Sequence, residues 1–402
     1  MIDNSATDGP LIVNTLGARR PDAVRRGDPG NAVFQAADGR AVIPWTPLFE
    51  REPPLWRPPS EILLRLGGAD VMFWNDSSGH SPIYGNKARK YEFLLANLHW
   101  AKVQRTATMG AVSSNHVLQF ALANRMADLT GSGDALESEV NLILFEVPDA
   151  PTDQSRLTLL EQLSKKVVVT SNKIGLAGEI ARELAVREFE AEPEAIIPPG
   201  GSNELSALGH MNAIAELALA LEAMQDWREP PDMIFVPMGS GSTVLGLILG
   251  VRLLGWRTKI VGVADQDMSY VSRLVANQQP STPFVEGNVA RLAAKTIAWL
   301  QAIKFPGIDF TTDELLRTGA FLPDSTSWAP GYGLVEASDE VWRDRFAAAG
   351  VKLDPVFTLK AWRSLTRMAE SGALKGKRVI FWNTYNAFDY ASLGRAGTNA
   401  SL

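Results

Sequence analysis

Residues 84–94 carry a lysine where stability alone would not place one. The segment reads YGNKARKYEFL, and from Lys87 large side chains recur at helical spacing through Tyr91 to Leu98. This spacing puts Lys87 on the buried stripe of an amphipathic helix, where an ammonium group is costly. Desolvation lowers the pKa of a lysine, so its free amine can form a Schiff base with a carbonyl compound. The segment therefore predicts a reactive lysine.

The same helix start concentrates positive charge. Asn86 is predicted to cap the helix, which places Lys87, Arg89 and Lys90 in the first turn. The helix dipole and the free N–H groups disfavour cations there, so we expect an anionic or electrophilic group to compensate. The alternative is an ordinary helix start whose lysines extend to water.

Three polar residues follow the next predicted strand. Ser113, Ser114 and Asn115 lie in the segment MGAVSSNH, between a strand and a helix. Any one of them could cap the helix, but three exceed what one cap requires. Because open α/β sheets bind ligands at such turns, these side chains are candidates for ligand contact.

A turn of small polar residues lies further along the chain: Gly239, Ser240, Gly241, Ser242 and Thr243. Such residues let consecutive N–H groups approach an anion at a helix start, which predicts a phosphate site; a tight connection is the plain alternative. A rival interpretation is a nicotinamide-dependent oxidoreductase, in which Asp265 would accept a hydrogen bond from a ribose hydroxyl. Its spacing is poor, because Val244 stands where G-x-G-x-x-G needs glycine.

Composition narrows the class of protein. The 402 residues, 46% of them hydrophobic, suffice for two domains or one large α/β unit with an insertion. The net charge of −6 argues against nucleic acid as a partner. The chain has no cysteine, and its four histidines do not pair at metal-ligand spacing, so no metal site is expected. Without a spanning apolar run or a signal-peptide core, a cytoplasmic location is expected.

Apolar runs and helical patterns alternate after a polar, turn-rich stretch at 1–45, which we interpret as an N-terminal extension. Strands are predicted at 71–74, 106–109, 141–147, 167–170, 233–238, 259–264 and 378–382. Helices are predicted at 87–102, 115–128, 156–165, 174–190, 206–225, 243–255, 288–302, 338–349 and 355–371. This alternation is typical of an α/β fold with open, mostly parallel sheets covered by helices.

Several of these segments resemble one known family. GNKARKYEFL is similar to the GGNKxRKLEFL motif of the 1-aminocyclopropane-1-carboxylate deaminase and D-cysteine desulfhydrase family, which has the tryptophan-synthase-β-like fold (fold type II) and uses pyridoxal 5'-phosphate. Further similar blocks are SSNH at 113–116, PPGGSNELSALGHMNA at 198–213, GSGSTVLG at 239–246, GYG at 331–333 and DPVFTLKA at 354–361. The resemblance covers roughly residues 45 to 392.

The resemblance implies a role for each matching residue. Lys87 would bind the cofactor aldehyde covalently, while Lys90 and the turn at 239–243 would hold the phosphate. Asn115 would bond to the 3-oxygen of the cofactor, and Ser114 would serve the substrate as carboxylate anchor or acid/base. Tyr332 would be catalytic together with Lys87 and Ser114. The side chains of the substrate pocket would be Ser113, Ser114, His116, Tyr332, Phe357 and Tyr385.

The resemblance also implies an architecture. Residues 46–87 and 206–402 would form a large cofactor-binding domain, and residues 88–205 a smaller inserted domain. A small amino acid would be the substrate, with the cofactor bound between the domains. A homodimer is expected as well.

Departures from the family pattern favour one reaction. Phe357 stands where ring-opening members commonly have tyrosine, and Tyr385 replaces a glycine beside the expected pocket. Thr358 matches the position opposite the pyridine nitrogen, where a hydroxyl leaves that nitrogen largely neutral; alternatively it is an ordinary helix residue following a cap at Asp354. We therefore expect a pyridoxal-phosphate-dependent lyase that performs β-elimination and yields a 2-keto acid and ammonia. Ring-opening deamination of 1-aminocyclopropane-1-carboxylate, β-replacement and a cofactor-binding pseudoenzyme are the alternatives.

Overall fold

The computed structural model describes residues 43, 45, 48–49, 55–76, 81–101, 103–126, 138–146, 153–170, 188–189, 194–227, 229–265, 284–330, 334–390 and 392–393. Most of the predicted extension at 1–45, most of the predicted helix at 174–190, and Tyr332 lie outside these residues.

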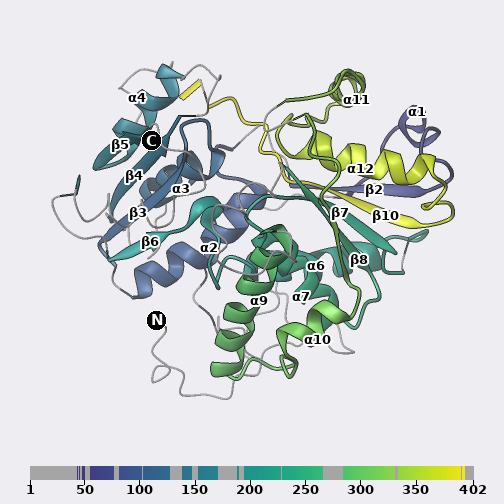
Figure 1. Cartoon of the computed structure of the whole chain (residues 1–402), viewed down its shortest axis with the longest axis horizontal. Coiled ribbons are helices and arrows are strands. Elements are labelled where there is room, and N and C mark those ends of the chain that lie inside the picture. The colour runs from purple at the N-terminus through teal and green to yellow at the C-terminus, as the bar shows by residue number, and fades with distance from the viewer. Residues whose placement is uncertain are drawn as a thin grey trace.

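Two open sheets organise the described chain (Figure 1). The larger has the strand order β1-β2-β10-β7-β8-β9 and the smaller β5-β4-β3-β6. All neighbouring pairs are parallel except β1 with β2. The strands of the larger sheet are β1 (Leu55–Trp56), β2 (Asp70–Asn75), β7 (Met233–Met238), β8 (Lys259–Ala264), β9 (Phe321–Asp324) and β10 (Arg378–Asn383). Those of the smaller sheet are β3 (Arg105–Ala111), β4 (Glu139–Phe145), β5 (Lys166–Thr170) and β6 (Ala195–Ile197).

Helices cover both faces of the larger sheet (Figure 1). One face packs against α6 (Leu208–Glu222), α7 (Ser242–Leu253) and α9 (Phe284–Ala302), with α10 (Thr312–Arg317) beside them. The other packs against α1 (Ser60–Leu63), α11 (Ala337–Ala348) and α12 (Thr358–Glu370). The smaller sheet carries α3 (Asn115–Met126) and α4 (Gln154–Leu163). This architecture confirms the predicted α/β class with mostly parallel sheets.

Helix α2 (Gly85–Trp100) lies between the two sheets. Its stripe of Tyr91, Leu94, Leu95 and Leu98 joins the core of the smaller sheet, as the spacing predicted, while Phe93 joins the core of the larger one. A helix with apolar contacts on both sides is buried nearly all round. The residues at its start are therefore held by two cores.

The regular elements follow the sequence prediction closely, and the short ones do not. Strands at 233–238 and 259–264 are found with the predicted bounds. The strands β1, β6 and β9 and the helices α1 and α10 were not predicted. The three strands have four residues or fewer and the two helices have six or fewer, less than two helical turns, so no hydrophobic period emerges. The predicted cap Asn86 is also wrong, because α2 begins one residue earlier, at Gly85.

The strands of the smaller sheet lie within residues 88–205 and those of the larger sheet lie outside them, whereas the C-terminal segment contacts the smaller sheet. Tyr390 is buried in the core of the smaller sheet, and Phe388 and Leu393 pack against it. These residues were assigned to the large domain. The exact domain division remains a prediction.

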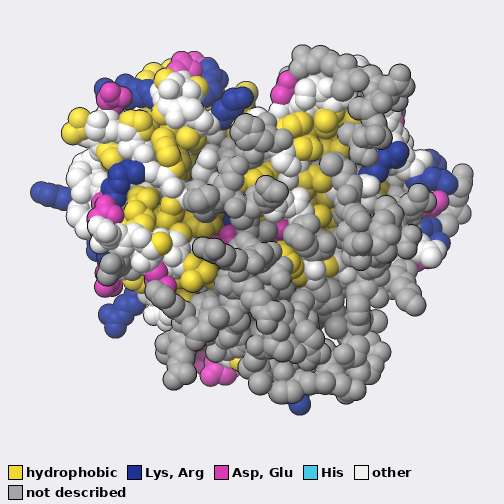
Figure 2. Space-filling view, turned by 180° about the vertical axis from the view of Figure 1, so that it is seen from behind, with side chains coloured by type: hydrophobic (Ala, Val, Ile, Leu, Met, Phe, Trp, Pro, Cys, Tyr) yellow, Lys and Arg dark blue, Asp and Glu magenta, His cyan; other side chains and the backbone are white. Residues whose placement is uncertain are grey.

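On the face shown in Figure 2, the described Lys and Arg side chains are scattered among Asp and Glu side chains and form no continuous basic stripe. Among the described residues, no helix is both long and apolar enough to cross a membrane.

A buried ion pair fastens α2 to the larger sheet. Arg89, 2% exposed, donates to both carboxylate oxygens of Asp76 at 2.9–3.0 Å and to Glu216 of α6 at 2.9–3.0 Å. Asp76 also accepts from the indole N–H groups of Trp74 and Trp382, both at 3.1 Å. The anionic partner expected for the cationic helix start is thus present for Arg89.

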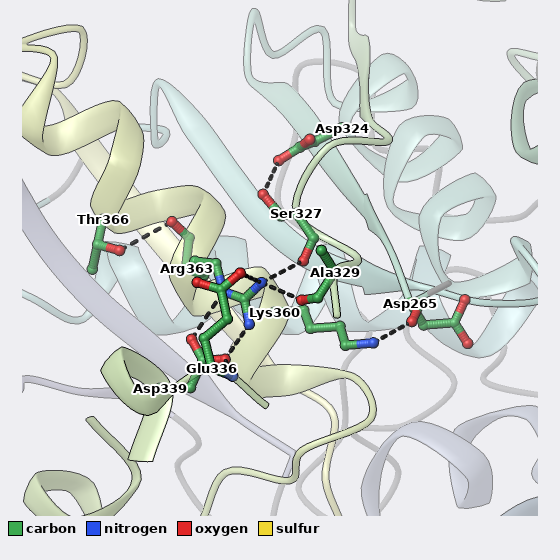
Figure 3. A network of polar contacts seen from close by, with 9 residues as sticks. All are labelled: Asp265, Asp324, Ser327, Ala329, Glu336, Asp339, Lys360, Arg363 and Thr366. Atoms are coloured by element: carbon green, nitrogen blue, oxygen red, sulfur yellow. Dashed lines mark hydrogen bonds and ion pairs between the residues drawn. The ribbon is translucent and has the colours of Figure 1, made fainter. Parts of the chain in front are cut away.

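A second buried arginine fastens α12. Arg363 bonds to Asp339 and Glu336 at the start of α11, and to the carbonyl groups of Ser327 and Ala329 (Figure 3). The segment between β9 and α11 is thereby tied to the helix that carries Phe357 and Thr358 at its start.

Removing the Arg89 guanidinium should destabilise the protein strongly. Arg89→Met leaves Asp76 buried without its charge partner, which typically costs about 3–5 kcal/mol. The control is Arg57→Met, because Arg57 pairs with Asp70 and Asp226 at the surface and such pairs are worth about 1 kcal/mol or less. Denaturant unfolding measures both changes. Equal losses for the two variants would contradict a structural role for the Arg89 pair.

Candidate active site

The carboxyl ends of the parallel strands form one edge of the larger sheet. Met238 of β7 pairs with Ala264 of β8, so Gly239 and Asp265 follow at neighbouring positions. At the end of β2, the close approach of Gly85 to the Asp76 carbonyl leaves no room for a Cβ atom. The start of α2 and the turn after β7 are therefore brought to the same edge, where open α/β sheets bind ligands.

Two lysines meet at the start of α2. Lys87 is half-buried, and burial lowers its pKa to about 8, an effect opposed by Asp265, Lys90 and Asp354. Lys90 is 1% exposed, donates from Nζ to the Gly200 carbonyl at 3.2 Å, and has a pKa well below its usual value because of burial and the neighbouring Lys87. The interpretation that these lysines simply extend to water fails for Lys90. A free amine is available here near neutral pH.

Serine side chains from two turns converge beside these lysines. Ser202 Oγ lies 2.5 Å from Ser240 Oγ and 3.0 Å from Ser242 Oγ. Gly200 leaves little space, since a Cβ atom there would come within 2.5 Å of Ser240 Oγ. Gly241 has φ of 91°, a left-handed conformation that favours glycine, immediately before α7. The predicted phosphate turn is therefore a cradle of hydroxyl and N–H groups at a helix start.

Ser202 was not assigned a role from the sequence. It lies in the turn PPGGSN at 198–203, part of a segment that resembles the family but is far in sequence from 239–243. The two consecutive glycines before it, both with positive φ in the structure, were the only local sign of a tight turn at this position. Only the fold brings the two turns together.

Asn86 links the lysine helix to this cradle. Its Oδ1 accepts from Thr243 Oγ1 at 2.7 Å and from His210 Nε2 at 2.8 Å. Burial, with nearby Lys90 and Arg89, holds the pKa of His210 well below its usual value, so the imidazole is neutral. Thr243 thus positions the start of α2 with its side chain, and Asn86 does not cap the helix.

The predicted polar run at 113–116 lies on the side of the smaller sheet. Ser113 is exposed, whereas Ser114 and Asn115 are half-buried. The Oδ1 atom of Asn115 accepts from Arg156 Nη2 at 3.0 Å. These side chains remain accessible to a ligand, and their predicted roles stay predictions.

His116 is enclosed instead. Its ring nitrogens lie 2.7 Å from Tyr91 Oη and 2.8 Å from Thr108 Oγ1, and the side chain is 2% exposed. A Cβ atom on Gly201 would lie 3.3 Å from the imidazole. His116 therefore holds the 113–115 turn against the glycine turn, a burial that does not favour its predicted place in the substrate pocket.

The start of α12 carries Phe357 and Thr358. A Cβ atom on Gly239 would lie 3.3 Å from the Phe357 ring, so this aromatic side chain borders the turn after β7. Thr358 Oγ1 donates to Asp354 Oδ2 at 2.7 Å and accepts from Asp354 N at 2.6 Å. Asp354 also accepts from the N–H groups of Val356 and Phe357, as a cap does. The hydroxyl of Thr358 is thus already engaged, and its role at a ring nitrogen stays a prediction.

Tyr385 follows β10 and is half-buried. Burial raises the pKa of its phenol; Asp354 acts in the same direction and Arg156 in the opposite one. The predicted pocket residue therefore lies within electrostatic reach of both the α12 start and the α4 start. Tyr332, the remaining predicted residue, lies outside the described chain.

Asp265 was considered only under the nicotinamide alternative, and Lys360 was not predicted as a site residue. Lys360 Nζ donates to the backbone carbonyl of Asp265 at 2.5 Å (Figure 3). Burial lowers the pKa of Lys360 to about 8 and raises that of Asp265 to about 7. Perturbed pairs of this kind cluster at functional sites.

The donor set fits pyridoxal phosphate. The serine and glycine cradle with buried Lys90 suits a phosphate, and the low pKa of Lys87 suits an aldehyde partner. Among the described residues, no group of three or more His, Cys, Asp or Glu side chains could hold a metal ion.

Relatives are found along most of the chain. Proteins of Pyrococcus horikoshii and Pyrococcus abyssi, both provisionally named 1-aminocyclopropane-1-carboxylate deaminases, are each 26% identical over 82% of this chain and 89% of their own. A crystal structure of a homologue of that deaminase superposes with a TM-score of 0.65 at 24% identity, over 88% of this chain and 96% of its own. A fungal L-serine ammonia-lyase from Rhizomucor miehei superposes with a TM-score of 0.54 at 16% identity, over 85% of this chain and 96% of its own.

These similarities confirm the predicted resemblance and the tryptophan-synthase-β-like fold. The family described as pyridoxal-phosphate dependent enzyme matches residues 59–318, more than half of the chain. The matched region contains the lysine helix, the polar turn at 113–116 and the cradle. The chain therefore belongs to the pyridoxal-phosphate-dependent enzymes.

Proposed function

We propose that the protein removes a β-substituent and the amino group from a small amino acid, giving a 2-keto acid and ammonia. The observation that carries this proposal is the half-buried Lys87, with a pKa of about 8, beside a serine and glycine cradle. When bound, pyridoxal phosphate supplies an aldehyde that condenses with amines and a ring that withdraws electrons from the substrate Cα. The nicotinamide alternative requires a dinucleotide fingerprint that the 239–246 turn lacks.

Each residue of the candidate site has a proposed role. Lys87 would hold the cofactor through its aldehyde, and its amine, with a pKa of about 8, would be available as a base for the substrate Cα proton. Lys90, the 239–243 turn and Ser202 hold the phosphate. Asn115 would hold the cofactor ring, and Ser114 would serve the substrate as carboxylate anchor or acid/base. We also propose a homodimer, as the resemblance implies.

Phe357 favours elimination over ring opening. Its ring borders Gly239, so it lies at the proposed cofactor turn without offering a hydroxyl. Opening a cyclopropane needs a group that attacks or protonates a ring carbon, whereas elimination needs only a leaving group at Cβ. The named Pyrococcus relatives support ring-opening deamination as the second candidate function.

Lys87 should carry the cofactor covalently. Borohydride reduction of the holoenzyme followed by peptide mapping should place the pyridoxyl group on Lys87, and Lys87→Ala should abolish it. Covalent binding to the cofactor-free protein should increase as pH rises through about 8, where the amine loses its proton. Lys377→Ala, at the surface, is the control and should retain the adduct. An adduct on Lys90 or Lys360 would refute the assignment.

The cradle should recognise phosphate. Gly241→Asp adds bulk 3.1 Å from Val289 Cγ2, strains a left-handed residue and places a negative charge beside a dianion. We expect cofactor affinity to fall at least about tenfold, measured by titration of absorbance. Gly255→Asp is the matched control, since Gly255 also has positive φ but lies beyond the opposite end of α7 with no atom within 4 Å of an added Cβ. If both variants bind the cofactor as the parent does, the turn is only a connection.

Substrate preference should follow the pocket walls. Keto acid should be released faster from D-cysteine or β-chloroalanine than from 1-aminocyclopropane-1-carboxylate, because a good leaving group departs without help from a hydroxyl. Tyr385→Gly should broaden the substrate range by opening space, and Phe357→Tyr, which adds only a hydroxyl, should raise the rate with the cyclopropane. Steady-state assays of keto-acid release decide this. Faster turnover of the cyclopropane by the parent enzyme would reject elimination.

A further inference from the structure

The start of α4 places an arginine beside the predicted cofactor residue Asn115. Arg156 Nη2 donates to Asn115 Oδ1 at 3.0 Å, and both side chains are half-buried. A guanidinium group has donors and no acceptor, so the Asn115 atom that it contacts has to be the amide oxygen. The contact therefore fixes which way the amide of Asn115 is turned.

The nitrogen of the same amide is left for a ligand. Among the described residues, no hydrogen bond from Asn115 Nδ2 is found. Asn115 begins α3, beyond the carboxyl end of β3, where open α/β sheets bind ligands. Because an amide nitrogen can only donate, the ligand atom opposite Nδ2 has to be an acceptor.

An aromatic ring holds Arg156 in place. The guanidinium carbon lies 5.6 Å from the centre of the Tyr390 ring, within cation–π range. Tyr390 Oη donates to the Pro82 carbonyl at 2.8 Å and accepts from Asn386 Nδ2 at 3.1 Å. The ring is thereby fixed to the segment that leads into α2. The direction of Arg156 is thus tied to the helix that carries Lys87.

Two phenols lie within electrostatic reach of Arg156. Burial raises the pKa of Tyr385 and of Tyr390, and Arg156 opposes this rise in both. Since burial outweighs Arg156, both phenols are neutral at neutral pH. Arg156 therefore brings a positive charge to a region bordered by a predicted pocket residue, where burial weakens screening by water.

We propose that Arg156 is a positioning residue, which presents Asn115 Nδ2 to the 3-oxygen of the cofactor ring and favours that oxygen as an anion. The oxygen accepts from Nδ2, while Arg156 donates to Oδ1 of the same amide, so the guanidinium charge acts through two hydrogen bonds in series. No covalent bond forms or breaks. The inference deepens the proposed function and rests on it. The alternative is that Arg156 only joins α4 to α3.

The test compares two ligands that differ by one oxygen atom: pyridoxal 5'-phosphate and its 3-deoxy analogue. Both are titrated, with absorbance as the signal, into full-length protein stripped of cofactor. Arg156→Met removes the charge and the donor, so it should weaken binding of pyridoxal phosphate roughly tenfold and leave binding of the analogue nearly unchanged. Equal losses for the two ligands, or no loss for either, would overturn the proposal.

Three further variants separate positioning from stability. Arg156→Lys keeps a cationic donor for a contact that uses one nitrogen, so it should retain most of the preference for pyridoxal phosphate over the analogue. Arg156→Gln removes the charge but stays polar. It should lower that preference too, and it decides the matter if the methionine variant does not fold. Arg105→Met is the matched control and should change neither affinity, because Arg105 begins β3 at the end far from Asn115 and pairs with Glu194.

Coupling between the two residues gives an independent readout. Asn115→Ala should already lose the preference for pyridoxal phosphate, and adding Arg156→Met should lower it no further. A further loss in the double variant would mean that Arg156 acts on the ligand directly, and the positioning role would be refuted.

The two levels of inference fail differently. Absence of a Lys87 adduct and of cofactor binding in the parent would reject the proposed function itself. A normal Lys87 adduct, with Arg156→Met weakening both ligands alike, would reject only the role of Arg156.

Discussion

The buried pair of Arg89 with Asp76 and Glu216 is the interaction on which the site depends. A guanidinium with 2% exposure has to be paired, and its two acids belong to the end of β2 and to α6. Arg89 thereby fixes the rotation of α2 about its axis. Because Lys87 and Lys90 lie two residues before and one after it, their directions are fixed too. The lysine predicted to react is thus positioned by an ion pair that has no proposed part in the chemistry.

The cradle depends on a second constraint, the close approach of segments distant in sequence. Gly246 of α7 leaves no room for a Cβ atom beside Ala207 and His210, and Gly209 likewise beside Arg89. These glycines let α2, α6 and α7 pack closely, so that Asn86 can bond to Thr243 and His210. Backbone proximity, and not hydrophobic burial alone, therefore joins the lysine to the phosphate turn.

The sequence predicted the long elements, the lysine and the cradle turn because each leaves a local pattern. Helical spacing exposes Lys87, and five small polar residues mark 239–243. Ser202 was missed because it has no local pattern and reaches the cradle only through the fold. Asn86 was assigned to capping by a local rule, although its partners lie more than a hundred residues away.

The residues of the cradle are joined by hydrogen bonds. Lys90, Asn86 and the serine hydroxyls are bound to one another or to backbone, so replacing any one disturbs the others. Phe357 borders Gly239 and Tyr385 is half-buried after β10, and both are proposed to act on the substrate by shape. A chain of this family can thus keep its cofactor chemistry while its substrate changes. We therefore expect the specificity of this protein to depend on the walls formed by these two side chains, and not on the cradle.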